Sequence, residues 1–278
     1  MADALARNFD SPVVEATLNY MVDTGAKPVT RIARPGERPT RRQGLFEAHK
    51  VAIRDGRAEA GDFGLDREGF VLTHHASKVS DFYDEDEVRD IYYPETERLV
   101  QDFTGAAKVF VFDHTLRADS EATQAEKQVR EPVQVVHNDY TDRSAPQRIR
   151  DLLPADEAEA RLKDRFAVVQ VWRPIGAPVE RMPLAICDAQ SIAAEDFKPT
   201  ELRYEHRVGE VLQLAYNPDH RWFYIPKMTK DEALVFKCYD SLTDGRARFT
   251  AHSAFDDPRT PPEAPERESI EMRTLVFY

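Results

Sequence analysis

The feature that most constrains the fold is an apolar, β-branched run that leads directly into a His-x-Asp triplet, Val133–Tyr140. β-Branched residues favour strands, and residues i and i+2 of a strand point to the same face, so His137 and Asp139 are expected to project side by side. One imidazole and one carboxylate are two of the three ligands of the facial triad that holds non-haem Fe(II). The triplet alone also fits the polar end of a strand, so a third ligand has to be sought elsewhere in the chain.

Composition and charge exclude several classes of protein. The 278 residues suffice for a large core, and no apolar run approaches the roughly 20 residues of a membrane span. The first residues show no secretory leader. A net charge of -12 argues against nucleic-acid binding, because such proteins need clustered basic surface. Cys187 and Cys238 are too few for a disulfide framework, which favours the cytoplasm. A small molecule is the expected partner, and the oligomeric state is left open.

Short strand patterns recur along the chain, and helical patterns are fewer. Residues 1–45 show little periodicity and are expected to form an irregular wrap with a short helix at 13–22. Strands are expected at 49–54, 70–72, 108–114, 133–140, 167–173, 183–188, 210–216, 221–225, 233–239, 248–252 and 267–277, and helices at 84–99, 147–153 and 155–166. The polar segment 117–131 fits either a lid at an active-site rim or a disordered excursion.

These elements predict a mainly β protein with flanking helices. Many short strands favour a double-stranded β-helix, the jelly roll of cupin-like proteins. No linker divides the sequence, so 1–278 is expected to be a single domain, with the wrap at 1–45 and the jelly-roll core with its helical flanks at 46–278.

The third candidate ligand is His252, which lies at the end of a predicted strand far downstream of the triplet. A single histidine is more often structural, so the assignment of His252 as a ligand depends on the segment that follows it. In the last strand, Arg267, Ser269, Glu271 and Arg273 alternate with other residues and share one face. This face is either exposed to solvent, as is usual for an antiparallel strand, or turned inward.

Buried arginines require paired anions, and a guanidinium beside a hydroxyl is a good receptor for one end of a dicarboxylate. The order His-x-Asp, distant His, Arg-x-Ser is what a 2-oxoglutarate-dependent iron oxygenase needs.

Eight short motifs carry a resemblance to a known family. They are DFYDEDE at 81–87, VFDHTLR at 111–117, VHNDY at 136–140, VWRPI at 171–175, PLAICD at 183–188, DEALVFKCYDS at 231–241, HSAFDDP at 252–258 and RESIEMR at 267–273. Through them the chain resembles the hydroxylase/desaturase family that includes fungal gibberellin-desaturase-like enzymes, aspergillic-acid-type hydroxylases and 7α-cephem-methoxylase subunit-like proteins. The resemblance extends over most of the chain.

The resemblance implies a double-stranded β-helix with Fe(II) at His137, Asp139 and His252. It also implies 2-oxoglutarate and O₂ as cosubstrates. The far carboxylate of 2-oxoglutarate would pair with Arg267 beside Ser269, with Arg273 as the reserve candidate. Tyr140 is expected to pack against the cosubstrate. The implied reaction oxidises an unactivated C–H bond of a specialised metabolite or an amino-acid-derived molecule, by hydroxylation, desaturation or oxidative cyclisation.

Further residues are weaker candidates for binding the substrate: His114, Arg117, Arg173 and Tyr239. Arg117 and Arg173, together with Arg273 of the last strand, suggest a carboxylated substrate. Two other classes stay open from the residues alone. One is a catalytically silent jelly-roll binding protein, and the other is a Zn-dependent hydrolase built on the same His/Asp/His set. Metal content and 2-oxoglutarate turnover distinguish them.

Overall fold

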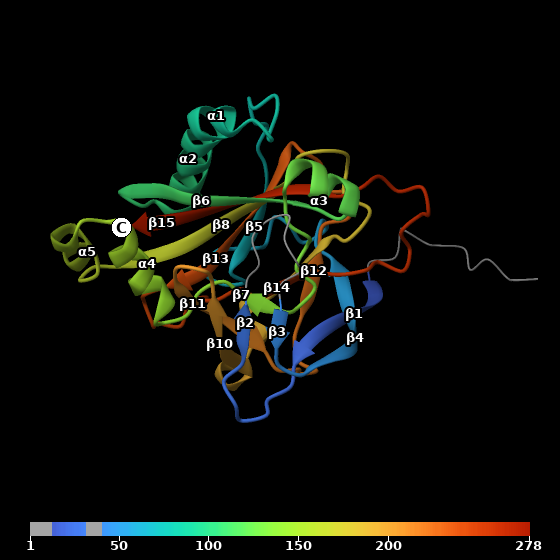
Figure 1. The fold of residues 1–278 in the computed structure, drawn as a ribbon, viewed down its shortest axis with the longest axis horizontal. Helices are drawn as coiled ribbons and strands as arrows, with labels where there is room; N and C mark the ends of the chain where they lie inside the picture. Colours follow the sequence, from blue (N-terminus) through green and yellow to red (C-terminus); the bar gives the residue numbers. More distant parts are fainter. Residues whose placement is uncertain (1–12, 32–40) are drawn as a thin grey trace, which may run out of the picture.

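The computed structural model describes residues 13–31 and 41–278. Within them, two curled sheets face each other, and helices cover the outer face of the smaller one (Figure 1). The larger, ten-stranded sheet contains, in spatial order, β1 (Val13–Met21), β4 (Phe46–Asp55), β12 (Trp222–Tyr224), β9 (Leu184–Cys187), β14 (His252–Ala254), β7 (His137–Asn138), β11 (Val208–Leu214), β10 (Phe197–Arg203), β2 (Val29–Arg31) and β3 (Arg41–Gln43). The smaller, five-stranded sheet contains β5 (Phe70–His74), β13 (Glu232–Asp240), β8 (Phe166–Pro174), β15 (Glu268–Phe277) and β6 (Lys108–Ala118).

The smaller sheet is buried on both faces because helices pack on its outer side. That helical segment runs through α1 (Glu85–Glu87), a π-turn η1 (Val88–Tyr92) and α2 (Tyr93–Thr104), close to the helix predicted at 84–99. It begins where the Asp84 side chain accepts the first free N–H groups, and it ends at Gly105 in the left-handed conformation. Its apolar residues pack on Val169, Val171 and Met272 of the sheet.

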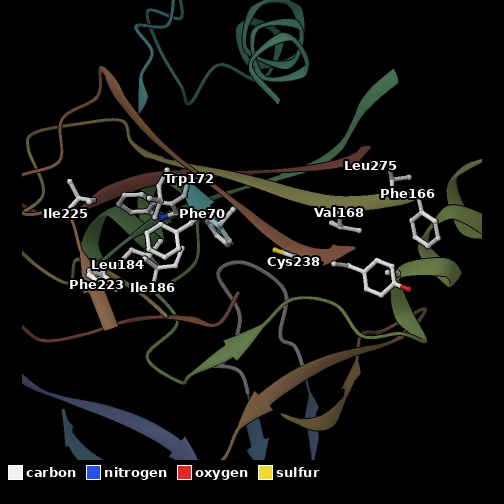
Figure 2. Packing of buried hydrophobic residues seen from close by; sticks show 14 of the residues in the cluster. Phe70, Phe166, Val168, Trp172, Leu184, Ile186, Phe223, Ile225, Cys238 and Leu275 are labelled. Carbon is white, nitrogen blue, oxygen red and sulfur yellow. The ribbon is translucent and has the colours of Figure 1, made fainter. Parts of the chain in front are cut away.

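The main core fills the space between the two sheets (Figure 2). From the smaller sheet, Phe70, Val168 and Trp172 point inward, and Ile186 and Phe223 of the larger sheet meet them. Successive residues of a strand face opposite ways. The inward position of Trp172 therefore turns its neighbour in the sequence, Arg173, toward the helices.

Two expectations for the N-terminal part are wrong. Of the helix expected at 13–22, residues 13–21 form the strand β1, which pairs antiparallel with β4 along its whole length. Every second residue from Val14 to Tyr20 is buried, which is the period of a half-buried strand. The part of the expected wrap that the structure describes also contains β2 and β3 and is not irregular. Residues 1–12 and 32–40 lie outside the described ranges, and the single-domain organisation stays a prediction.

The other elements follow the predictions with local differences. The polar segment 117–131 contains α3 (Glu121–Lys127), and the two later helices are α4 (Ser144–Leu152) and α5 (Ala155–Arg161). The strand expected at 133–140 is only two residues long, and the one expected at 248–252 begins at His252. The strand β10 was not expected. Two short 3₁₀ turns precede it, η2 (Ala189–Ser191) and η3 (Ala194–Asp196).

Among the described residues, none of the helices has the length and apolar character that a membrane crossing requires. Cys187 and Cys238 are buried and form no disulfide.

Candidate active site

The three predicted metal ligands come together where β7 and β14 pair. His137 and His252 are directly opposite each other in this antiparallel pair, and Asp139 follows β7 immediately. One ligand atom from each of the three residues can be chosen so that all three lie within 4.8 Å of one another. His137 Nε2 lies 3.4 Å from Asp139 Oδ1, and the two imidazole rings are 4.4 Å apart. This spacing allows the three donor atoms to bind one metal ion on one side, as a facial set of ligands does.

Backbone carbonyls orient both imidazole rings. His137 Nδ1 lies 2.7 Å from the carbonyl oxygen of Val135, and His252 Nδ1 lies 3.2 Å from that of Thr250. A carbonyl only accepts, so each Nδ1 carries the proton and each Nε2 keeps its lone pair for a metal. Burial lowers the pKa of His252 to about 4, with the neighbouring His137 acting in the same direction. His252 is therefore neutral near pH 7, as a metal ligand must be.

The Asp139 carboxylate is held by the last strand. Its Oδ2 lies 3.3 Å from Arg273 Nε, which leaves Oδ1 directed at the imidazoles. Burial favours a raised pKa for Asp139, but the adjacent His137 and the charge of Arg273 outweigh burial and hold the pKa well below its usual range. The site thus presents the Nε2 atoms of two imidazoles and one carboxylate oxygen.

Asn138 fixes the backbone between two of the ligands. It is fully buried, and its side-chain amide donates to the carbonyls of Tyr140 and Cys238 at 2.8 and 2.9 Å. Its Oδ1 accepts from the backbone N–H of Thr250 at 3.1 Å. One side chain therefore connects the metal-binding turn to β13 and to the approach of β14.

The polar face of β15 is turned inward, which decides the alternative that the sequence left open. Glu271 accepts from Arg117 and from Arg273, whose Nη2 lies 2.8 Å from Glu271 Oε2. Arg273 also donates to Thr115 Oγ1 at 2.9 Å. Burial acts to raise the pKa of Glu271, but the two arginines overcome it and lower the pKa to about 2. Arg273 also pairs with Asp113 at 3.7 Å, so it is committed to three carboxylates and a hydroxyl.

Arg267 is buried in a different environment. It is 2% exposed, lies over the ring of Trp172 at 5.1 Å, and donates to the Met182 carbonyl at 2.6 Å and to Ser269 Oγ at 3.2 Å. Its Nε is buried without a hydrogen-bond partner. Burial lowers the pKa of Arg267 to about 10, although Glu271 opposes this at longer range. No carboxylate within the described ranges hydrogen-bonds this guanidinium, so its surroundings fit an incoming anion.

A cavity of 950 Å³ opens at the candidate metal ligands His137 and Asp139. Tyr140 and Arg273 line it, as do two of the weaker candidates, His114 and Arg117. Arg267 is not among the residues that line this cavity. The ring of Tyr140 contacts Phe112 edge to face, with 6.5 Å between the centroids.

The structure places the other two weaker candidates away from the cavity. Arg173 lies on the outer face of the sheet, where its Nη2 is 2.6 Å from His75 Nδ1 and its guanidinium covers Tyr92. Tyr239 stacks on Phe166 with 5.3 Å between the rings. Neither lines the cavity.

Four further arginines line the cavity and were not predicted: Arg130, Arg143, Arg148 and Arg207. Arg130 belongs to the polar segment between β6 and β7, where the sequence offers no periodicity to tell which side chains turn inward. Arg148 lies on α4 at a helical position that carries no motif, and its guanidinium covers Phe112 at 4.9 Å.

Comparison with known proteins agrees with this geometry. A family model described as "Oxidoreductase/YMDC permease-like domain" matches residues 18–277. The hydroxylase/desaturase efuI of Hormonema carpetanum is 34% identical over 96% of both chains. The Fe(II)/2-oxoglutarate-dependent dioxygenase nvfI of Aspergillus novofumigatus is 34% identical over 82% of this chain and 83% of its own.

A solved structure of the iron and alpha-ketoglutarate-dependent endoperoxidase NvfI superposes with a TM-score of 0.83 at 29% identity, covering 96% of this chain and 98% of that one. The jelly-roll prediction and the predicted family resemblance are confirmed. The chain belongs to the hydroxylase/desaturase family of Fe(II)/2-oxoglutarate-dependent oxygenases.

Proposed function

We propose that His137, Asp139 and His252 bind one Fe(II), that Arg267 binds the far carboxylate of 2-oxoglutarate, and that O₂ is used to oxidise an unactivated C–H bond of a small molecule. The observation that carries the proposal is the convergent donor set, in which both Nδ1 atoms face carbonyl oxygens and both Nε2 atoms are free for a metal. Fe(II) bound there would couple the oxidative decarboxylation of 2-oxoglutarate to succinate and CO₂ with the oxidation of the substrate.

The residues of the chain hold and orient this centre. Arg273 keeps one oxygen of Asp139 turned away from the imidazoles, so that the carboxylate binds the metal through the other. Asn138 fixes the turn that carries Asp139. Phe236 packs on the ring of His252 with 4.8 Å between the centroids and supports an apolar, water-poor surrounding. Such outer contacts set the angle of each ligand.

Arg267 is the preferred anchor for 2-oxoglutarate because its charge lacks an acidic hydrogen-bond partner. Arg273, the reserve candidate, already hydrogen-bonds Asp139 and Glu271. Ser269 adds a hydroxyl beside Arg267, as a bidentate carboxylate site requires. Tyr140 remains a candidate for packing against the cosubstrate.

The test compares two buried arginines of the same sheet. Arg267→Gln removes the proposed anchor, and Arg173→Gln removes an arginine that is equally stacked on an aromatic ring but lies on the outer face. Isothermal titration of the Fe(II)-loaded protein with 2-oxoglutarate under argon measures the dissociation constant. We expect Arg267→Gln to raise it by about tenfold or more, since a charge-assisted hydrogen bond is lost, and Arg173→Gln to leave it unchanged. Normal binding in Arg267→Gln together with lost binding in Arg273→Gln would reassign the anchor.

The family membership favours an oxygenase over a zinc hydrolase or a silent binding protein. Within the family, hydroxylation, desaturation and oxidative cyclisation share the same first hydrogen abstraction and differ in what the substrate does next. An ¹⁸O₂ label in the product distinguishes hydroxylation from desaturation and from oxidative cyclisation. The cytoplasm is the proposed location, since both cysteines are free and buried.

A further inference from the structure

The segment between β6 and β7 places one arginine in the wall of the cavity. The backbone N–H of Arg130 donates to the carbonyl of Leu116, and the carbonyl of Arg130 accepts from the N–H of Ala118 at 3.0 Å. These bonds form a parallel bridge in which Arg130 is paired with Arg117. Paired residues of neighbouring strands project to the same face. The bridge therefore holds Arg130 next to Arg117, and both line the cavity.

Among the residues that the structure describes, Arg130 lacks the acidic partner that Arg117 and Arg273 have. Arg117 is neutralised by Glu271, and Arg273 by Glu271 and Asp139. Arg130 forms no ion pair or side-chain hydrogen bond within residues 13–31 and 41–278, although Glu131 is its neighbour in the chain. Burial, followed by the charge of Arg117, lowers its pKa. A half-buried cation in this position is stabilised by an added anion.

The cavity around Arg130 is large and partly apolar. Its volume of 950 Å³ lies near the upper end of the range of about 300–1,000 Å³ for small-molecule sites. The apolar residues that line it are Leu116, Val129, Val133, Val135, Leu202, Val208 and Val211. A molecule that fills this space would meet these apolar side chains and also polar and charged ones, which outnumber them in the lining.

We infer that the substrate is a small molecule with an apolar part and a carboxylate, and that Arg130 binds this carboxylate in the cavity. The inference rests on the proposed function, in which 2-oxoglutarate occupies a separate anchor at Arg267. The sequence suggested a carboxylated substrate because of Arg117, Arg173 and Arg273. In the structure, Arg117 and Arg273 are neutralised by carboxylates and Arg173 lies outside the cavity, so Arg130 takes their place as the residue that binds the carboxylate.

The experiment uses decanoate and decanamide, which have the same chain and differ in charge. Dissociation constants for both are measured by isothermal titration of the Fe(II)-loaded protein at saturating 2-oxoglutarate, under argon. The variants are Arg130→Gln and, as a matched control, Arg143→Gln. Arg143 lines the same cavity, but its side chain is 71% exposed and it pairs with Glu210 at 3.8 Å.

The wild type is expected to bind decanoate at least about tenfold more tightly than decanamide. Arg130→Gln removes this preference, Arg143→Gln retains it, and Arg130→Lys restores part of it. Equal affinities in the wild type, or a preference that survives in Arg130→Gln, would overturn the inference.

A titration with 2-oxoglutarate alone separates this inference from the proposed function. Arg130→Gln is expected to bind 2-oxoglutarate like the wild type. If the variant loses 2-oxoglutarate affinity, Arg130 serves the cosubstrate and the inference fails, while the iron site and the 2-oxoglutarate dependence of the proposed function stand. If the Fe(II)-loaded wild type does not bind 2-oxoglutarate, the proposed function itself fails.

Discussion

Replacing Glu271 by Gln tests the buried charge network behind the metal centre. The substitution keeps the size of the side chain but removes the carboxylate that Arg117 and Arg273 share. Glu271, Arg117 and Arg273 have side chains only 10%, 11% and 13% exposed. Water therefore cannot replace the lost anion, and two guanidiniums would be left with one fewer partner between them.

Two routes give the same order of magnitude for the loss. The arginines lower the pKa of Glu271 from 4.5 to about 2, and each pKa unit corresponds to about 1.4 kcal/mol, so the ionised form stabilises the fold by about 3 kcal/mol. Breaking a buried ion pair by removing one partner costs about 3–5 kcal/mol in other proteins. For a domain of this size, 1 kcal/mol shifts the melting temperature by about 2–4 °C, so a decrease of about 6–12 °C or more is expected.

Urea unfolding at pH 7 measures the effect, with Glu159→Gln as the control. Glu159 pairs with Arg150 on the exposed surface, and its loss should leave the unfolding midpoint unchanged. The pKa of Glu271 is lowered in the folded state, so its contribution is present above about pH 4.5 and is lost as the pH falls toward 2. The difference between the wild type and Glu271→Gln should shrink over that range. A loss below about 1 kcal/mol at pH 7, or one independent of pH, would refute the reasoning.

Two other substitutions test parts of the fold that position the site. Gly69 has φ +90°, and a Cβ there would lie 2.2 Å from Thr250 Oγ1, so Gly69→Ala should cost about 2 kcal/mol or more in urea unfolding. Gly25→Ala (φ +74°, with open space around it) should cost less, and equal losses would contradict the steric argument. Burial lowers the pKa of His220 despite the nearby Asp196, so the wild type should lose stability relative to His220→Gln as the pH falls below about 6.5. Parallel stability curves for the two proteins would contradict that sign.

The sequence indicated the candidate metal ligands because their spacing carries information. His137 and Asp139 are two residues apart after an apolar run, and in an extended chain this spacing places both side chains on the same face. The argument holds although the strand itself is only two residues long. The polar alternation in β15 was also visible. The sequence did not show whether this polar face of β15 points into the protein or toward solvent, because both arrangements have the same two-residue period. Only the helices packed on the other face of the sheet decide it.

Errors arose where tertiary context decides the outcome. Arg173 was considered for the site, but the inward position of its neighbour Trp172 turns it toward the helices. The strand β1 was taken for a helix, although the alternation of its buried residues is regular, because its pairing with β4 was not visible in the sequence. Arg130 enters the cavity through a bridge to Arg117, a contact between segments that no local pattern records.

The central claim is that His137, Asp139 and His252 hold an iron with positions open for 2-oxoglutarate. Anaerobic addition of 2-oxoglutarate to the Fe(II)-loaded protein tests it most directly, because chelation of such an iron by a keto acid gives a weak visible charge-transfer band. The account predicts this band in the wild type and its loss in Asp139→Ala. A wild-type protein that binds Fe(II) without developing the band, or an Asp139→Ala variant that develops it fully, would contradict the account.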